Sequence, residues 1–152
     1  MKLIAHRGNT NGPDSNIENS PDQIDKCIDL GYDVEIDIRY DAPANRFWLG
    51  HDEPQHLVTW WWLAGRANNL WIHCKDIATL HEFTKNTAGY NYFWHQNDDY
   101  TLTSKRYIWS YPNKPYTSNT VIVMPEMNDM DIDKLRVTNC YGICTDYPTQ
   151  YK

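Results

Sequence analysis

The sequence predicts an α/β fold in which parallel strands alternate with short helices or loops. Eight short runs rich in apolar and β-branched residues have the length of buried strands and are separated by turn residues. A clear helix signal lies between the first two runs, and this alternation is typical of parallel sheets. The predicted strands are residues 2–6, 33–39, 46–50, 70–75, 90–94, 106–110, 120–124 and 141–145.

The best-supported helix is predicted to begin after Ser20. Serine is a favoured N-cap residue, and Pro21 then occupies the first helical position, where its missing N–H costs nothing. An apolar stripe follows and stops at Gly31, a residue type that commonly ends a helix. Weaker signals predict short helices over 76–85 and 131–137, and the later connections are expected to lack full helices.

Length, composition and charge limit the classes of protein to be considered. The 152 residues, 41% of them hydrophobic, predict one folded domain over residues 1–152 and leave its oligomeric state open. A net charge of −6 without clustered Lys and Arg argues against nucleic acid as a partner. No apolar stretch approaches the ~20 residues of a membrane span and no secretion signal precedes the first strand, so we expect a cytoplasmic protein. The four cysteines are expected to be reduced and mostly buried.

Glu35 and Asp37 are candidates for a metal site. Alternate side chains of a strand share a face, so the two carboxylates project together from the predicted strand 33–39. Two carboxylates this close repel each other unless a cation lies between them, and oxygen ligands favour Mg²⁺ or Ca²⁺. The alternative is an exposed acidic pair on an edge strand, which the apolar neighbours Val34 and Ile36 argue against.

Two histidines at strand ends are candidates for proton transfer. His6 and His51 each end a short apolar run, and imidazole has an ordinary pKa close to neutrality. One of them can act as acid and the other as base, in an order that depends on the orientation of the substrate. Because a lone histidine at a strand end is more often structural than catalytic, neither histidine by itself is sufficient evidence for catalysis. Arg7 adds a planar cation suited to a phosphate, beside Gly8, where the backbone can approach closely.

Four segments in the first third of the chain form a specific combination. They are His6-Arg7-Gly8, Glu18-Asn19-Ser20, Glu35-x-Asp37 and His51-Asp52. In order and spacing they resemble the N-terminal signature of the glycerophosphodiester phosphodiesterases, which belong to the wider phospholipase C-like phosphodiesterase superfamily. The segment 142–148, Gly-Ile-Cys-Thr-Asp-Tyr-Pro, also resembles the closing strand and loop of that family. Each segment alone would be a weak signal, and the combination is specific.

The resemblance implies a TIM-type (β/α)8 barrel that binds one divalent metal ion. It implies Glu35 and Asp37 as metal ligands. The general acid and base would be His6 and His51, and Arg7 would contact the phosphate. An ordinary barrel of this type takes about 250 residues. The 152 residues of this chain therefore predict a compact barrel with several short or missing outer helices.

The third metal ligand departs from the family pattern. The family has Glu-x-Lys where this chain has His73-x-Lys75, so His73 takes the place of a glutamate. The resemblance implies His73 as a ligand and Lys75 as a nearby cation on the same face of the strand. A neutral imidazole makes Mn²⁺ or Zn²⁺ an option beside the more strongly expected Mg²⁺ or Ca²⁺. The alternative role of His73 is to hydrogen bond beside the metal site.

The predicted substrate-binding residues are Arg7, Lys75, Glu18 and His95. Glu18 belongs to the segments that carry the resemblance. His95 directly follows the predicted strand 90–94, where it either faces the substrate or belongs to a helix-capping turn.

Several aromatic residues near later strand ends have two interpretations. Trp94, Trp109 and Tyr111, together with Glu126, either shape a pocket or pack in the barrel. The triplet Trp60-Trp61-Trp62 is expected to pack a helix on the barrel, because an exposed triplet would promote aggregation.

The residues and the resemblance together predict a metal-dependent phosphodiesterase that cleaves a glycerophosphodiester-like or related small phosphodiester. The two histidines would transfer protons while the metal ion and the cations stabilise charge on the phosphate. One alternative is a lyase or transferase acting on the phosphodiester of a lipid headgroup or a glycan precursor. The other is a barrel that binds a phosphorylated ligand without turnover.

Overall fold

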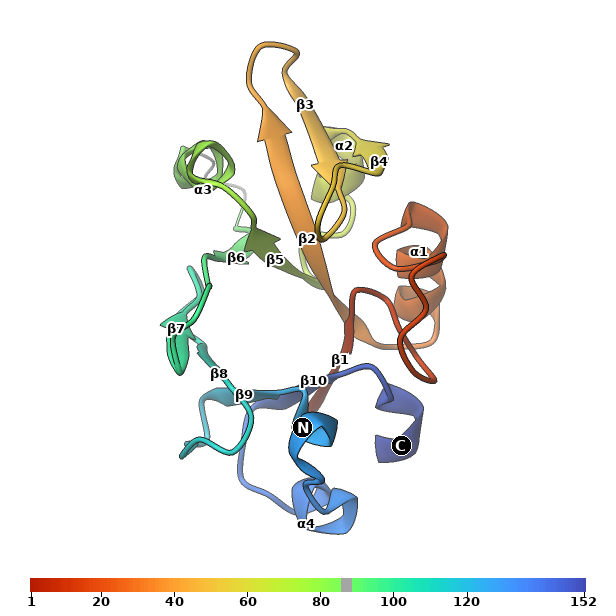
Figure 1. Ribbon diagram of the computed structural model, residues 1–152, viewed down its shortest axis with the longest axis vertical. Helices are drawn as coiled ribbons and strands as arrows, with labels where there is room; N and C mark the ends of the chain where they lie inside the picture. Colours follow the sequence, from red (N-terminus) through yellow and green to blue (C-terminus); the bar gives the residue numbers. More distant parts are fainter. Residues whose placement is uncertain (86–88) are drawn as a thin grey trace.

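The computed structural model describes residues 1–85 and 89–152. The ten strands found in these residues form one sheet, which curls into an incomplete ring except for the two strands within residues 46–58, and the helices lie outside the ring (Figure 1). Within the described residues, parallel ladders join seven strands in the order β6-β5-β2-β1-β10-β9-β8. The bounds are β1 Lys2–His6, β2 Asp33–Asp41, β5 Leu70–Cys74, β6 Asn91–Phe93, β8 Ile108–Ser110, β9 Thr120–Val123 and β10 Gly142–Thr145.

Seven of the eight predicted strands belong to this parallel ladder, which confirms the α/β class. The closed TIM-type (β/α)8 barrel is corrected to an open, barrel-like sheet. β7 Tyr100–Leu102 pairs antiparallel with β8, and within the described residues no ladder joins β6 to β8. Only residues 103–107 link β7 to β8, whereas a parallel connection needs a dozen residues or more. Ser104 nevertheless hydrogen bonds with Tyr92 of β6, at 2.8 and 3.0 Å, across the open side.

The predicted strand 46–50 lies outside the parallel ladder. It is β3 Arg46–Leu49, which pairs antiparallel with β2 and with β4 His56–Val58. The four-residue connection 42–45 between β2 and β3 permits a hairpin and excludes a parallel crossover. The hairpin returns the chain to the middle of β2, where the Gly50 N–H donates to the carbonyl oxygen of Asp37 at 3.1 Å.

The helices are few and short. Ser20 caps the first of them, as predicted, and its side chain accepts a hydrogen bond from the Gln23 N–H. The helices predicted over 76–85 and 131–137 are also present. The described helices are α1 Pro21–Asp29, α2 Trp60–Ala64, α3 Ile77–Thr84 and α4 Ile132–Arg136, with the 3-10 turns η1 Pro125–Asn128 and η2 Pro148–Tyr151.

The two faces of β2 have different surroundings. Val34, Ile36 and Ile38 are fully buried in a hydrophobic cluster shared with α1 and α3. Glu35 and Asp37 are also buried but face the inside of the ring. A second hydrophobic cluster packs inside the ring as well. The second cluster consists of Ile4, Trp71, Phe93, Trp109, Val121, Val123 and Cys144.

The tryptophan triplet is divided between core and surface. Trp60 of α2 packs against Phe47 with ring centroids 4.5 Å apart, as expected for a helix packed on the sheet. Trp61 is 88% exposed, which differs from the expectation for the whole triplet. All four cysteines are free and buried, as predicted.

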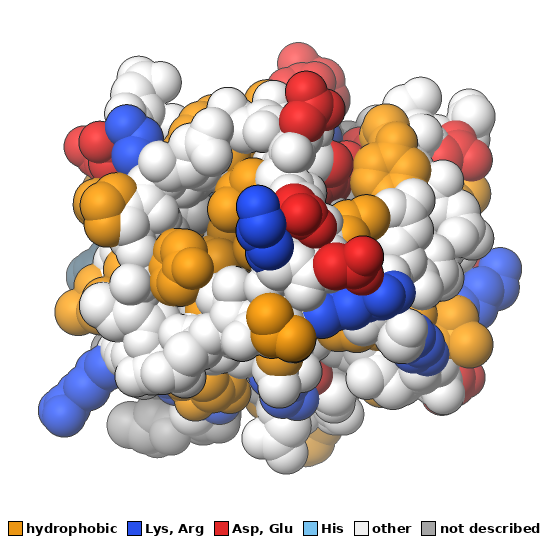
Figure 2. Space-filling view, turned by 90° about the horizontal axis from the view of Figure 1, so that it is seen from below, with side chains coloured by type: hydrophobic (Ala, Val, Ile, Leu, Met, Phe, Trp, Pro, Cys, Tyr) orange, Lys and Arg blue, Asp and Glu red, His pale blue; other side chains and the backbone are white. Residues whose placement is uncertain are grey.

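The surface mixes charges of both signs on the face that Figure 2 shows, where Lys and Arg side chains are interspersed with Asp and Glu side chains. Among the described residues, no helix has the length and apolar character needed to cross a membrane.

Thr79 joins α3 to β2 through a buried hydroxyl. Its Oγ1 accepts a hydrogen bond from the Tyr40 N–H at 2.6 Å and donates to Asp76 Oδ1 at 2.7 Å. We predict that Thr79→Val lowers the free energy of unfolding by about 2 kcal/mol, because the Tyr40 N–H is then left without an acceptor. Urea denaturation measures the change. The control is Thr84→Val on the exposed side of α3, and an equal loss in both variants would contradict the assignment.

Candidate active site

A cavity of about 530 Å³ opens where the parallel strands end at their C-terminal edge. Parallel strands in a curled sheet bring their C-terminal ends together, so residues far apart in sequence meet there. All nine predicted site residues line this cavity: His6, Arg7, Glu18, Glu35, Asp37, His51, His73, Lys75 and His95.

Glu35, Asp37 and His73 form its most compact polar group. One ligand atom from each lies within 4.8 Å of the others, so the three residues can hold a metal ion. Asp37 and His73 are partners in the ladder between β2 and β5, and side chains at paired positions project side by side. His73 Nδ1 lies 3.1 Å from Asp37 Oδ1 and 3.7 Å from Glu35 Oε1. Both carboxylates are almost fully buried, at 2% and 1% exposure.

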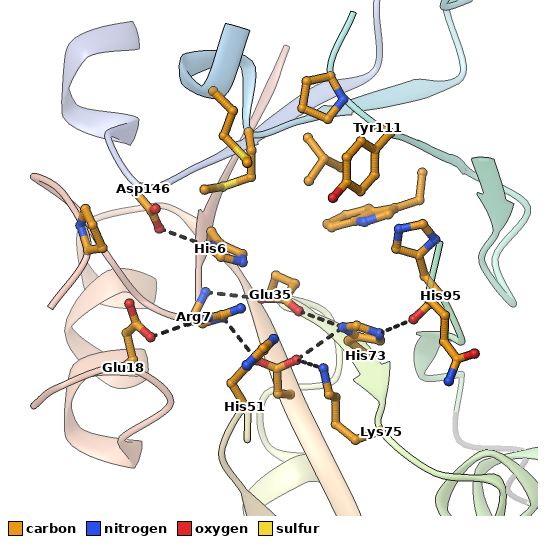
Figure 3. Close-up of a pocket in the computed structure, with 18 of the residues that line it drawn as sticks. His6, Arg7, Glu18, Glu35, His51, His73, Lys75, His95, Tyr111 and Asp146 are labelled. Atoms are coloured by element: carbon orange, nitrogen blue, oxygen red, sulfur yellow. Dashed lines mark hydrogen bonds and ion pairs between the residues drawn. The ribbon is translucent and has the colours of Figure 1, made fainter. Parts of the chain in front are cut away.

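The orientation of His73 follows from a hydrogen bond on its far side. Its Nε2 donates to the backbone carbonyl of His95 at 3.0 Å (Figure 3). Its ring stacks on that of Phe93, with centroids 5.2 Å apart. Nδ1 is thereby directed at the two carboxylates. Burial lowers the pKa of His73, but the hydrogen bonds to Asp37 and Glu35 and their charges outweigh it and raise the pKa to about 9. Burial alone would raise the pKa of Asp37, yet His73 and Lys75 hold it well below its usual range.

Two further cations surround the carboxylates. Arg7 Nε lies 3.2 Å from Asp37 Oδ2, and another of its nitrogens donates to Glu18 Oε2 at 3.3 Å. The Arg7 N–H also donates to Glu35 Oε2 at 3.2 Å, with the backbone in the left-handed region at a φ of 52°. Lys75 Nζ lies 3.2 Å from Asp37 Oδ1. Arg7 and Lys75 thus pair with the buried Asp37 carboxylate inside the cavity.

His6 is held by Asp146, a residue to which the sequence analysis assigned no role. His6 Nδ1 lies 2.8 Å from Asp146 Oδ1, and the fully buried Asn9 donates from Nδ2 to Asp146 at 2.8 Å and to Glu18 at 2.9 Å. Burial lowers the pKa of His6, but Asp146 and Glu35 raise it by more, so that it lies above its usual value. The signal for Asp146 was its position directly after the last predicted strand, within the segment that resembles the family.

Asn19 orients one of the carboxylates. Its Oδ1 accepts from the Asp37 N–H at 2.9 Å, and its Nδ2 donates to Asp37 Oδ2 at 3.2 Å. Asn19 has a φ of 58°, a conformation that asparagine tolerates better than most residues. Asn19 belongs to one of the segments that carry the family resemblance, but no contact was predicted for it from the sequence.

His51 lies on a loop that Arg39 fixes. The Arg39 guanidinium donates to the carbonyl oxygens of Gly50, His51 and Asp52, the last two at 2.6 and 3.0 Å. Gly50 has a φ of 145°, and a Cβ there would lie 2.1 Å from the carbonyl oxygen of Glu53. The His51 side chain is 38% exposed, and its Nδ1 lies 2.8 Å from Asp52 Oδ1. His51 is therefore more accessible than His6, whose side chain is 16% exposed.

The residues of the opposite side include His95 and three aromatic residues named from the sequence. Trp94, Trp109 and Tyr111 line the cavity, and the His95 ring lies 5.6 Å from that of Tyr111. Burial and the nearby His73 lower the pKa of His95. Glu126 instead accepts hydrogen bonds from Thr145 Oγ1 and the Asp146 N–H, at 2.9 and 2.8 Å, and supports the end of β10.

The pH dependence of stability is predicted to report the charged His73. A histidine whose pKa rises on folding contributes stability below its unfolded pKa, near 6.5, and the contribution is lost as the pH passes the folded value of about 9. In EDTA, wild-type protein is therefore expected to lose stability between pH 6.5 and 9.5, and His73→Gln is expected to lose less. Urea denaturation at the two pH values measures both. His81→Gln, on the exposed side of α3, is the control. The prediction would be refuted if His73→Gln lost as much free energy of unfolding between the two pH values as wild-type protein.

Comparison with known proteins shows a shared fold at low sequence identity. A glycerophosphodiester phosphodiesterase from Agrobacterium tumefaciens str. C58 aligns over 99% of this chain and 98% of its own, with a TM-score of 0.58 and 14% identity. One from Parabacteroides distasonis ATCC 8503 aligns over 99% and 94%, with a TM-score of 0.55 and 13% identity. No protein-family model matches the sequence, and no curated protein matches it. The chain thus shares the fold of these two phosphodiesterases.

Proposed function

We propose that this protein is a metal-dependent phosphodiesterase that acts on a glycerophosphodiester-like or related small phosphodiester. The observation that carries the proposal is the convergence of Glu35, Asp37 and His73 in one cavity with His6 and His51. Carboxylates, cations and two imidazoles in this arrangement meet the needs of metal-assisted phosphoryl chemistry. The fold shared with two glycerophosphodiester phosphodiesterases supports the same reaction class.

Glu35, Asp37 and His73 are the proposed ligands of one divalent metal ion. Two observations support the fit. Asp37 Oδ1 is buried and, among the described residues, has the ion-pair partners His73 and Lys75 but no partner with full hydrogen-bond geometry; His73 Nε2 donates to a backbone carbonyl, as metal-binding histidines commonly do. When bound, the ion would supply Lewis-acid stabilisation of charge on the phosphate oxygens. Mg²⁺ or Ca²⁺ suits the carboxylates, and the imidazole keeps Mn²⁺ and Zn²⁺ as options.

Arg7 and Lys75 are the proposed phosphate-binding residues. Both side chains reach the edge of the cavity beside Asp37, and Glu18 and Asp37 orient the Arg7 guanidinium. A phosphodiester carries one negative charge, and more charge builds on its oxygens during cleavage. Two cations held in advance at this position stabilise that charge without reorganisation during the reaction. His95 is proposed to line the substrate site on the opposite side.

His6 and His51 are the proposed acid–base pair, with His6 as the proton donor. Asp146 holds His6 Nδ1, which leaves Nε2 to face the cavity (Figure 3). The raised pKa of His6 favours the protonated ring, which can donate to a leaving alkoxide. The more exposed His51 would accept the proton of the attacking hydroxyl. A water hydroxyl gives a hydrolase, whereas a hydroxyl of the substrate gives a cyclic phosphate, and product analysis separates the two outcomes.

The metal site is tested by thermal shift and turnover together. We predict that Mg²⁺, Ca²⁺, Mn²⁺ or Zn²⁺ raises the melting temperature of wild-type protein and supports hydrolysis of bis(4-nitrophenyl) phosphate. The Glu35→Gln, Asp37→Asn double variant is expected to lose both effects, because an ion stabilises a protein only by binding the native state.

The matched control is Asp129→Asn, Asp133→Asn, which removes two exposed carboxylates outside the cavity and is expected to behave as wild type. A metal-induced shift that persists in the cavity variant would place the ion elsewhere. If no ion produces a shift or turnover, binding without catalysis is favoured. In that case Arg7, His73 and Lys75 alone balance the charge of the two carboxylates.

Replacement of either proton-transfer residue is predicted to impair turnover without unfolding the protein. His6→Ala and His51→Ala should each lower kcat by about 10²- to 10⁴-fold, the usual contribution of a general acid or base. Steady-state kinetics on an alkyl phosphodiester, whose leaving alkoxide needs a proton, measures the loss, and circular dichroism checks the fold. His81→Ala is the control, since His81 lies on the outer helix α3. Wild-type turnover in a cavity variant would remove that histidine from the mechanism.

A further inference from the structure

The cavity has two walls of different chemistry. Most charged and imidazole groups come from β2 and β5, from the loops that follow β1, β3 and β5, and from the end of β10, whereas the opposite side is aromatic and aliphatic apart from His95 and Gln96. In Figure 3, Tyr111 lies across the cavity from Arg7 and Glu18. The residues that we call the apolar wall come from the ends of β6, β8 and β9 and from η1: Trp94, Trp109, Tyr111, Val123, Met124 and Met127.

Packing of the core does not account for the whole apolar wall. Trp109 is 5% exposed and packs on Phe93 with ring centroids 4.6 Å apart, so it is part of the core as well as the floor of the wall. Tyr111 is 45% exposed and Met127 is 64% exposed, although both line the cavity. Large apolar side chains left in water beside a polar site are typical of a surface that a ligand covers.

We propose that the apolar wall binds an apolar substituent, alkyl or aryl, on one alcohol of the phosphodiester substrate. The inference rests on the proposed function, because the phosphate bound at Arg7 and Lys75 sets the point from which the substituent extends. Aromatic side chains offer broad apolar faces, and the flexible methionines adapt to the shape of the group they cover. The wall therefore selects for apolar surface.

A cationic substituent fits the same wall less well. Aromatic rings can bind a quaternary ammonium group, but such sites commonly add a carboxylate. No residue of the apolar wall is acidic, and two of the carboxylates that line the cavity, Glu18 and Asp146, are paired with Arg7 and His6. The Asp37 and Glu35 carboxylates are already paired with His73, Arg7 and Lys75.

The test measures binding, so that its outcome is independent of turnover. Four dialkyl phosphates share one methyl ester and differ in the second group, which is methyl, hexyl, benzyl or choline. Their Kd values are measured by calorimetry with and without Mg²⁺. Because a buried methylene is worth about fourfold in affinity, we expect the hexyl or the benzyl ester to bind at least ~10-fold more tightly than the methyl ester. The comparison of hexyl with benzyl identifies which apolar group is preferred.

Variants locate the preference on the apolar wall. Tyr111→Ala, Met127→Ala should reduce the hexyl-to-methyl ratio by several fold while the Kd of dimethyl phosphate changes less than twofold. Leu102→Ala is the matched control, because Leu102 is 62% exposed but lies on β7 outside the cavity. If the double variant does not fold, Met127→Ala alone is used.

Two results would overturn the proposal. One is equal affinity of wild-type protein for the methyl, hexyl and benzyl esters, and the other is tightest binding of the choline ester. The proposed catalytic function fails separately, when no 4-nitrophenyl ester is hydrolysed in the presence of any metal ion. Apolar preference without turnover would therefore support the wall and reject catalysis.

Discussion

The burial of two carboxylates on one strand is the constraint on which the rest of the site depends. β2 is packed on its outer face by Val34, Ile36 and Ile38, so its inner face must turn Glu35 and Asp37 into the ring. Buried charge is costly unless it is paired and hydrogen bonded. The neighbouring strands and loops offset that cost with cations and amides, and these groups are also the ones that the proposed phosphodiester substrate would need.

His73 stands where the family that the sequence resembles has a glutamate, and this difference affects the charge balance of the cluster. A third carboxylate would have increased the need for a bound cation, whereas a protonated imidazole partly supplies that charge. The hydrogen bond from Nε2 to the His95 carbonyl keeps Nδ1 directed at Asp37 in either state. His73 can therefore act as an internal cation or as a neutral ligand in one geometry, and metal binding would have to displace its proton.

The two sides of the open sheet supply cavity walls of different chemistry. β1, β2 and β5 are long enough to carry paired polar residues past the hydrophobic floor, and they supply the charged wall. β6 and β8 are three residues each, flank the side where β7 runs antiparallel, and lead into aromatic residues. In this half, aromatic packing such as Phe93 on Trp109 adds to the strand ladders. The same packing forms the floor of the apolar wall.

The sequence by itself determined the local features of this protein. The N-cap at Ser20, the shared face of Glu35 and Asp37, and the strands of the parallel ladder follow from periodicity and residue type over a few positions. Only the tertiary structure decided that Asp146 holds His6 across 140 residues, that Arg39 fixes the loop of His51, and that the sheet stays open. These features depend on the register of strands distant in sequence and on connection lengths, and a local pattern contains no information about which distant groups a closing sheet brings together.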